Sequence, residues 1–230
     1  MRIFPIKAFE DNYIWLIEKN GGVIIVDPGQ SKDLLNYLRD KKPYGILLTH
    51  NHYDHTGGVM DIKKVYGDIL VYGPEETSLI NDVNLSDGDV FSLMGLNFSV
   101  METSGHTYGH LSYLFDDNLF CGDALFMAGC GRVFTGDYRL AFKTIEKFKG
   151  LSDFIKVYPA HEYSLHNLDF AKKFMPSDRV DEEYKRVKAL RENNKVTLPT
   201  SIGLEKEINP FFRAKNFEDF VRLRKERDNF

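Results

Sequence analysis

The sequence is poor in the features that define several large classes of protein. Only two of its 230 residues are cysteine, Cys121 and Cys130, which is too few for a disulfide framework. No apolar run approaches the ~20 residues that a membrane-spanning helix needs. Residues 1–7 lack the apolar segment and the small-residue cleavage site of a signal peptide. We therefore expect a protein of the reducing cytoplasm that has no membrane partner.

A surplus of positive charge is also missing. The 30 lysine and arginine residues are outnumbered by 34 acidic ones, so the formal net charge is −4. No general electrostatic field attracts nucleic acid or an anionic membrane. What is present, 43% hydrophobic and 28% charged residues, is typical of a globular protein. The length suits one large domain, or one domain with a smaller appendage.

Histidine is concentrated in one short stretch, residues 49–58. The apolar run 45–48 before it is typical of a buried strand, and residues 59–66 after it are typical of a helix. The histidines are therefore predicted to lie on a strand-to-helix loop, a usual place for a site in a layered α/β fold. The stretch holds three histidines and one aspartate: His50, His52, Asp54 and His55.

The spacing of these four residues favours two adjacent metal ions over one. His50 and His52 can point the same way, as alternate residues of extended backbone do. Asp54 and His55 follow after the chain has turned, so they can address a second point. Imidazole and carboxylate groups are ligands that zinc and iron accept. The alternative, a polar loop with scattered histidines, does not explain four such residues in so short a stretch.

Three further candidate ligands follow later strands. His106, Asp123 and His161 each fall just past the end of an apolar run, with glycine or proline nearby. Taken singly, each histidine would more often be structural, and the aspartate would more often be a turn residue. Their recurrence at three strand ends favours a shared site.

The pattern of apolar residues predicts a strand-rich region followed by a helical one. Strands are expected at residues 2–6, 12–19, 23–26, 45–48, 69–72, 90–93, 96–101, 111–115, 119–121 and 154–158. Helices are expected at residues 31–41, 59–66, 138–149, 166–174, 178–193 and 216–229. Because no strand-like run of any length remains beyond residue 165, we place a domain boundary near residue 164.

These motifs resemble the metallo-β-lactamase superfamily and, within it, the glyoxalase II (hydroxyacylglutathione hydrolase) family. The family's THxHxDH motif corresponds to residues 49–55. Its later GH, GD and GHEY-type motifs correspond to Gly105-His106, Gly122-Asp123 and residues 160–163. The resemblance spans nearly the whole chain. It implies an α/β protein with an αββα sandwich that binds metal (residues 1–164) and a C-terminal α-helical domain that binds substrate (residues 165–230).

The resemblance also implies two divalent cations per chain, zinc first, with iron or manganese as alternatives. Such a pair, ~3.5–4 Å apart, lowers the pKa of a shared water, so that a metal-bridging hydroxide can attack a carbonyl that the cations polarise. Asp54 and Asp123 would then be the catalytic carboxylates. His50, His52 and His106 would hold one ion, Asp54, His55 and His161 the other, and Asp123 would bridge them.

The implied substrate is S-D-lactoylglutathione or a related glutathione thioester, cleaved to glutathione and a 2-hydroxy acid in methylglyoxal detoxification. On a helical projection Arg224 and Arg227 lie on the same side as the apolar Phe220, so they point inward, where an anion can meet them. Phe134 stands where some members of the family carry tyrosine. The resemblance assigns five residues to substrate binding: Arg132, Phe134, Tyr163, Arg224 and Arg227.

Other functions remain open at this point. A mononuclear-iron glutathione persulfide dioxygenase shares much of the motif but would use His50, His106 and Asp123 alone. A lactonase or nuclease of the same fold is also possible in principle, although the net charge argues against a nuclease. A closed structural zinc site would use thiolates, and neither cysteine is placed as a ligand. We further expect a monomer, with His110 supporting the site and His166 on the surface.

Overall fold

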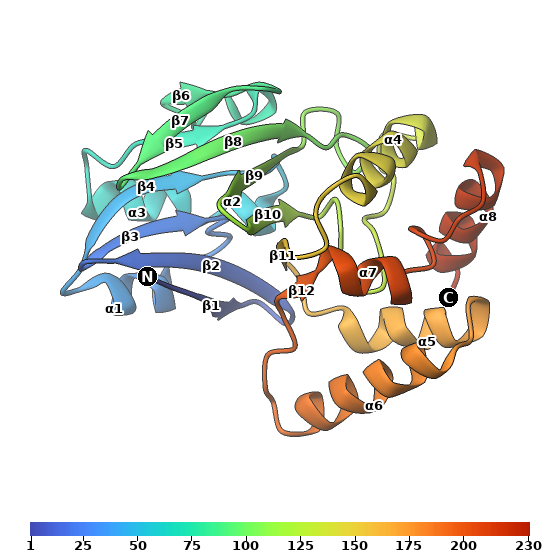
Figure 1. The fold of residues 1–230 in the computed structure, drawn as a ribbon. Helices are drawn as coiled ribbons and strands as arrows, with labels where there is room; N and C mark the ends of the chain where they lie inside the picture. Colours follow the sequence, from blue (N-terminus) through green and yellow to red (C-terminus); the bar gives the residue numbers. More distant parts are fainter.

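Two mixed β-sheets of six strands each form the centre of the computed structural model, which describes residues 1–230 (Figure 1). The first sheet holds its strands in chain order: β1 (Arg2–Ala8), β2 (Asn12–Lys19), β3 (Gly22–Val26), β4 (Lys42–Leu47), β5 (Val71–Gly73) and β6 (Val83–Asn84). The second sheet runs in the order β12 (Thr200–Ser201), β11 (Lys156–Pro159), β10 (Asn118–Gly122), β9 (Leu111–Phe115), β8 (Leu96–Glu102) and β7 (Val90–Leu93).

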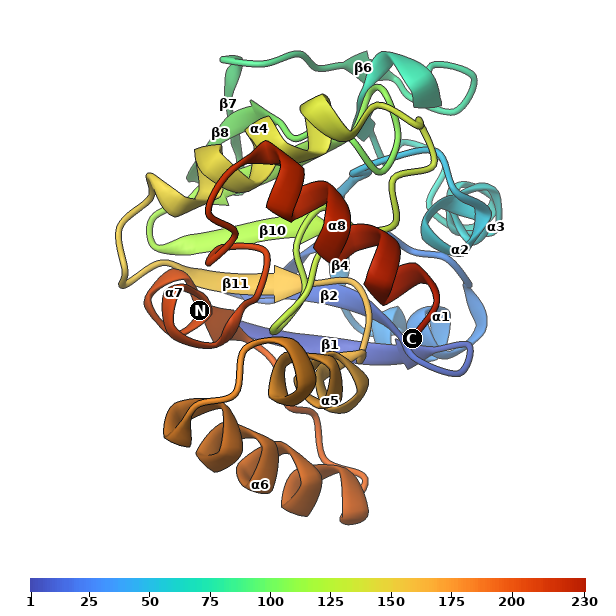
Figure 2. The same ribbon diagram turned by 90° about the vertical axis from the view of Figure 1, so that its right-hand side faces the viewer.

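Helices cover the outer faces of the sheets, and the longer ones gather at one end of the sandwich, on the right in Figure 1. The connections between strands of the first sheet hold short helices only: α1 (Lys32–Leu38), α2 (Tyr53–Thr56), α3 (Val59–Val65) and the 3-10 turn η1 (Glu75–Thr77). The longer helices come later: α4 (Tyr138–Lys149), α5 (Ser164–Phe174), α6 (Asp178–Glu192), α7 (Ile202–Ile208) and α8 (Phe217–Asp228). Figure 2 shows α8 running beside α4, with α5 and α6 below them.

The side-chain alternation of β2 shows why the first sheet needs cover on both faces. Tyr13, Trp15 and Ile17 belong to the core between the two sheets. Ile14 and Leu16 point the other way, into the core that the first sheet forms with α1 and α3. A strand that is apolar on both faces must lie in a three-layer arrangement at least.

The second sheet is covered in the same way. Leu119 and Cys121 of β10 pack in one core with Phe148 of α4 and with Phe220 and Leu223 of α8. The order of layers is therefore helices, sheet, sheet, helices. The predicted αββα sandwich with C-terminal helices is confirmed.

Most of the predicted elements are present, and residues 138–149 form the helix with the predicted bounds. Two elements beyond residue 165 were not predicted, β12 and α7, and the expectation that no strand follows this point is wrong. Residues 200 and 201 pair antiparallel with 157 and 156 of β11. A two-residue edge strand leaves no apolar run in the sequence, so only the tertiary pairing reveals it.

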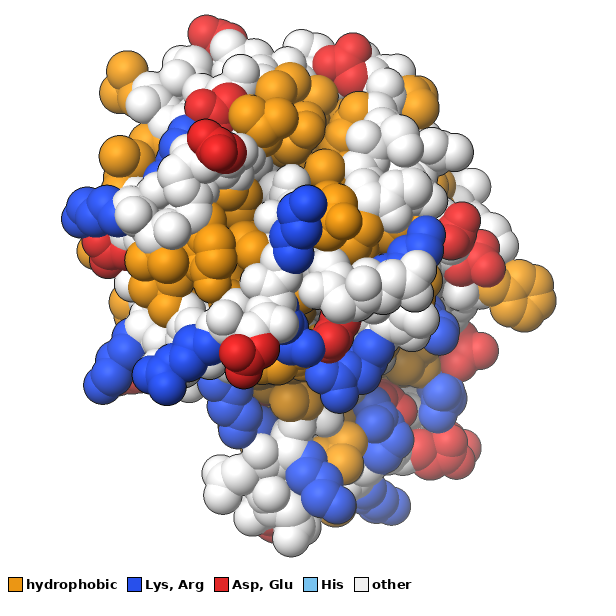
Figure 3. All heavy atoms as spheres, turned by 90° about the vertical axis from the view of Figure 1, so that its left-hand side faces the viewer, with side chains coloured by type: hydrophobic (Ala, Val, Ile, Leu, Met, Phe, Trp, Pro, Cys, Tyr) orange, Lys and Arg blue, Asp and Glu red, His pale blue; other side chains and the backbone are white.

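The strand ends that are followed by the candidate ligand residues lie at the helical end of the sandwich. The opposite end shows apolar side chains among lysines and arginines, and no histidine is visible on it (Figure 3). None of the helices combines the length and the hydropathy needed to cross a bilayer.

Close backbone packing between the loop after β3 and helix α2 generates a prediction about stability. A Cβ added at Gly29 would lie 1.7 Å from the carbonyl oxygen of Asp54. We expect Gly29→Ala to lower the free energy of unfolding by about 1–3 kcal/mol, because backbone must shift to accommodate the methyl group. Urea unfolding followed by circular dichroism measures this difference.

The matched control is Gly67→Ala, where an added Cβ meets no atom within 4 Å. This variant should change the free energy of unfolding by less than about 0.5 kcal/mol, or raise it slightly. Equal stabilities for the two variants would show that α2 can move away from β3 without penalty.

Candidate metal centre

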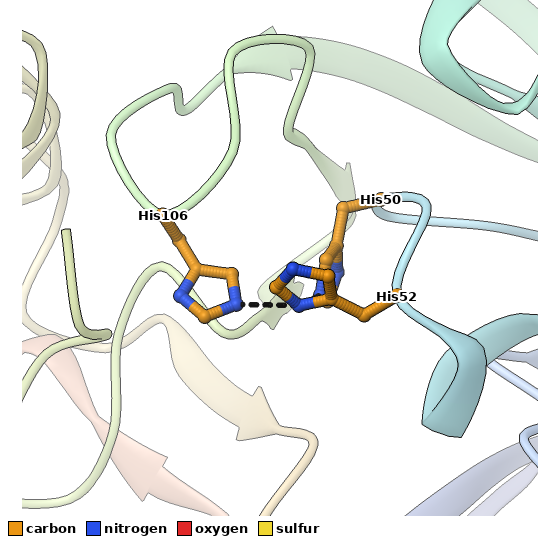
Figure 4. Close-up of side chains that lie close together, drawn as sticks. All are labelled: His50, His52 and His106. Atoms are coloured by element: carbon orange, nitrogen blue, oxygen red, sulfur yellow. Dashed lines mark hydrogen bonds between the residues drawn. The ribbon is translucent and has the colours of Figure 1, made fainter. Parts of the chain in front are cut away.

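Three imidazole rings converge where the loops after β4 and β8 meet (Figure 4). His52 Nδ1 lies 3.0 Å from His50 Nε2 and 3.0 Å from His106 Nε2. These three nitrogens come from segments more than 50 residues apart, yet they face one another as the ligands of a single cation do.

A second group of ligand atoms lies beside the first. Asp54 Oδ2 is 3.5 Å from His55 Nε2 and 3.4 Å from His161 Nε2. The one-turn helix α2 begins directly after His52, whose backbone is extended, and it carries Asp54 and His55. The ring of His55 also lies beside that of His50, with centroids 4.0 Å apart, so the two groups adjoin.

Asp123 lies between the two groups and presents one oxygen to each. Its Oδ2 is 3.4 Å from His106 Nε2, while its Oδ1 is 3.5 Å from His55 Nε2 and 3.3 Å from His161 Nε2. All seven predicted ligands are thus brought together: His50, His52, Asp54, His55, His106, Asp123 and His161.

Two buried atoms of this cluster, His55 Nε2 and Asp123 Oδ1, have no hydrogen-bond partner. A buried polar atom left without a partner costs about 1–3 kcal/mol. A cation between them would accept both lone pairs and remove that cost. The donor set of imidazole nitrogens and carboxylate oxygens therefore fits divalent metal ions.

Glycines let the chain reach these positions. Gly122 precedes Asp123 and has φ +48°, a left-handed conformation, and an added Cβ would lie 2.4 Å from Thr49 Oγ1. Gly105 precedes His106 with φ +138°, and its Cβ would lie 2.5 Å from Ala141 Cα. The glycines next to the candidate ligands thus have a packing reason.

Asp27 fixes the orientation of two ligands, and the sequence did not single it out. Thr49 Oγ1 donates to Asp27 Oδ2 at 2.7 Å, so it accepts from His50 Nδ1 at 3.0 Å. His55 Nδ1 donates to the same carboxylate at 3.1 Å. In the neutral form that binds metal, both histidines carry the proton on Nδ1 and present the Nε2 lone pair to the site. Asp27 directly follows β3, so the same strand-end rule would have found it.

The other two Nε2 ligands are oriented in the same way. His106 Nδ1 donates to the backbone carbonyl of Arg132 at 2.9 Å. His161 Nδ1 donates to Asp11 Oδ1 at 2.8 Å. Asp11 is 150 residues away in the sequence, and no local signal connects it to His161.

The charges in the cluster support one another. Burial alone would raise the pKa of Asp123, but the adjacent His161 and His55 hold it well below its usual range. Burial and then the neighbouring His55 lower the pKa of His50, which keeps that ring neutral. The carboxylate is therefore ionised at neutral pH, as metal binding requires. Against the effect of burial, Asp123 raises the pKa of His55 and His161 well above the ordinary value, so a cation bound at these two rings would displace a proton.

A cavity of about 390 Å³ opens onto the cluster and joins it to the C-terminal helices. All five predicted substrate residues line it, together with five of the seven ligands. Four lining residues were not predicted as contacts: Phe126, Cys130, Asn167 and Asp228.

The two arginines of α8 donate hydrogen bonds to polar atoms of neighbouring segments. Arg224, only 4% exposed, donates to the Cys130 carbonyl at 2.6 Å and to Asp228 Oδ1 at 3.0 Å, and its buried Nε has no partner. Arg227 donates two hydrogen bonds to Asn167 Oδ1, at 3.1 and 2.9 Å. Both side chains line the cavity, on the inner side of the helix that the helical projection predicted.

Aromatic side chains form further walls of the cavity. Tyr163 stacks on the ring of His161, with centroids 4.7 Å apart. Phe134, 62% exposed, lies edge-on to His52 and His106 at 5.5 and 5.2 Å. These rings stand next to the ligand atoms, where a substrate's apolar groups would be in contact with them.

The remaining histidines and the cysteines behave as expected. His110 is buried and accepts a hydrogen bond from the backbone N–H of Asp123 at 3.2 Å. His166 is exposed beside Phe230. Both cysteines are buried and free.

Comparison with known proteins matches the whole chain. Residues 9–161 match the metallo-β-lactamase superfamily, and residues 162–230 match the C-terminal region of hydroxyacylglutathione hydrolase. The hydroxyacylglutathione hydrolases of Glaesserella parasuis serovar 5 and Actinobacillus pleuropneumoniae serotype 5b are 46% and 44% identical to it, with 100% of each chain covered. ETHE1 from Myxococcus xanthus has a similar fold, with a TM-score of 0.75 at 24% identity over 98% of this chain and 90% of that one.

The central place of Asp123 generates a prediction about metal content. Because one carboxylate faces both groups of ligands, Asp123→Ala should reduce the metal from about two ions per chain to one or fewer. Elemental analysis after dialysis measures this. The control is Asp40→Ala, which removes an exposed carboxylate after α1 and should keep the full content. Full metal in Asp123→Ala would contradict a bridging role.

Proposed function

Because the chain belongs to the hydroxyacylglutathione hydrolase family of the metallo-β-lactamase superfamily, we propose that it hydrolyses glutathione thioesters such as S-D-lactoylglutathione. The products are glutathione and a 2-hydroxy acid. One observation carries the proposal: a single cavity is lined both by the histidine and aspartate cluster and by Arg132, Arg224 and Arg227. A glutathione thioester needs both, because it carries a reactive carbonyl and two carboxylates.

The cluster has room in its ligand set for two divalent cations, and we infer zinc first, with iron or manganese as alternatives. When bound, they would bring the pKa of water toward neutrality and polarise the thioester carbonyl. The proposed ligands are the histidines of Figure 4 for one ion, Asp54, His55 and His161 for the other, and Asp123 for both.

Asp54 is the proposed proton carrier. Its side chain is 38% exposed and lines the cavity, and its Oδ2 is the oxygen that faces His55 and His161. We assign to Oδ1 the acceptance of a proton from the attacking water and its transfer to the departing thiolate sulfur. The thiol of glutathione has a pKa of roughly 8.5–9, so it leaves without a strong acid.

Arginine is suited to the carboxylates of the substrate. The guanidinium group is always charged and presents paired donors to a carboxylate. Arg224 and Arg227 would bind one carboxylate of glutathione, with Arg132 nearby on the same cavity. Tyr163 and Phe134 would contact the rest of the thiol moiety. In this proposal residues 1–164 carry the chemistry and also contribute Arg132, Phe134 and Tyr163 to recognition, while residues 165–230 add the two arginines of α8.

We expect a monomer that acts in the cytoplasm on a small molecule, without nucleic acid or membrane as partner.

A comparison of substrates tests the function. Purified, metal-loaded protein should hydrolyse S-D-lactoylglutathione with a kcat/KM at least about 100-fold above that for a coenzyme A thioester or a β-lactam, because neither places a carboxylate pair on the arginines. Oxygen uptake with glutathione persulfide tests the dioxygenase alternative. Oxygen uptake with about one iron per chain, and no thioester hydrolysis, would refute the proposal.

The arginines should affect binding more than chemistry. The glutathione carboxylate does not change charge as the carbonyl is attacked, so its contacts are equally strong in ground and transition states. A charge-assisted hydrogen bond contributes about 1.5–3 kcal/mol, so Arg224→Ala should raise KM by about 10- to 150-fold with little change in kcat. Steady-state kinetics at two ionic strengths measures the effect and its electrostatic share.

The matched control for this experiment is Arg222→Ala on the outer face of the same helix. Arg222 is exposed and pairs with Asp219 at 2.7 Å, away from the cavity lining. Its removal should leave KM within about twofold. KM values equal to the wild type for both Arg224→Ala and Arg227→Ala would show that α8 does not contact the substrate.

A further inference from the structure

Glu76 lies in η1, outside the set of residues assigned to the site, yet its carboxylate joins two of the loops that form it. Oε1 accepts from the Thr107 hydroxyl at 2.6 Å and from the Asn51 backbone N–H at 3.2 Å. Oε2 accepts from the Gly109 backbone N–H at 2.8 Å. All three donors belong to the loops after β4 and β8.

The two loops are the ones that carry the histidines of Figure 4. Asn51 stands between His50 and His52, and Thr107 directly follows His106. Each hydrogen bond to Glu76 therefore acts on a residue next to a ligand, or on the turn at Gly109. The carboxylate thus connects the two loops beside the point where His52 Nδ1 meets His106 Nε2.

Nearer the sheets, the same two loops are joined by backbone. The Leu111 N–H donates to the Thr49 carbonyl at 2.8 Å. Glu76 joins the same two loops a second time, farther from the sheets, in the part of each loop that carries the candidate ligands. Without it the loops would remain joined at their base and could move apart at the ligands.

The carboxylate is placed for this link by its own surroundings. It is half-buried and has no lysine or arginine partner. An added Cβ at Gly109 would lie 2.9 Å from Glu76 Oε2, so the absence of a side chain there permits the close approach. The turn that carries Glu76 is itself held by Asn81, whose side chain donates to the Pro74 carbonyl at 2.8 Å.

We propose that Glu76 is a positioning residue for the three-histidine half of the centre. It sets the affinity of that half for its cation through the two loops, without contact with the cation. Residues that orient metal ligands from outside typically change metal affinity by 10- to 100-fold when removed. The inference rests on the proposed metal-dependent function, but its consequence is a difference between the two halves of the centre.

Titration of the metal-free protein with Zn²⁺ alone, against a chromophoric chelator, tests the inference. The wild type should show two affinities. Glu76→Ala should weaken one of them by about 10- to 100-fold and leave the other within about threefold. In a His161→Ala background, which lacks a ligand of the other half, Glu76→Ala should weaken the remaining site by a similar factor.

Two further variants separate positioning from a general loss of stability. Glu76→Gln keeps an oxygen for Thr107 and Asn51 but turns an amide toward Gly109, so it should restore part of the affinity. Glu75→Ala removes the neighbouring carboxylate, which accepts from Asn84 at 2.8 Å and contacts neither loop. It should bind both ions as the wild type does.

The outcomes divide clearly. Loss of affinity at both halves together, or at neither, overturns the inference, and so does equal behaviour of Glu76→Ala and Glu75→Ala. Because no thioester is used, failure of the substrate assay with selective loss in this titration would overturn the proposed function alone. Normal hydrolysis with no selective loss would overturn the role of Glu76 alone.

Discussion

The structure depends on gathering ionised carboxylates and imidazoles in one buried place. Asp123 is only 6% exposed, and its Oδ1 has no hydrogen-bond partner although two imidazole nitrogens lie within 3.5 Å. Burying such a charge without compensation is unfavourable, and metal cations are the partners that accept several lone pairs at once. The centre is therefore most stable when it is filled, and its chemistry follows from the same cations.

The sandwich makes this arrangement possible because both sheets deliver strand ends to the same edge of the molecule. β4 of the first sheet brings His50, while β8, β10 and β11 of the second sheet bring His106, Asp123 and His161. Hydrogen bonds at Nδ1 then fix the rings of His50, His55, His106 and His161, so each Nε2 faces the site before a cation arrives. Preorganised ligands need no rearrangement when they bind.

A short hairpin connects the cluster to the arginines of α8. Phe126 and Gly129 pair through their backbones, and between them the Ala128 N–H donates to the buried Glu205 carboxylate at 2.8 Å. Asn209 donates to that carboxylate and to the Gly129 carbonyl. Burial raises the pKa of Glu205 to about 7, against the effect of these donors. The helical region therefore shapes the cavity as well as supplying the arginines.

The sequence by itself predicted the cluster of candidate ligands, the sandwich class and most of the helices. Metal binding demands particular side chains, and those side chains follow strand ends that the apolar pattern reveals locally. Only the tertiary structure decided which groups support them. Asp11 lies 150 residues from His161, Glu76 lies 31 residues from Thr107, and the two-residue β12 is a strand only because β11 is beside it. Such contacts form between segments that are distant in the sequence, so no local pattern of residues predicts them.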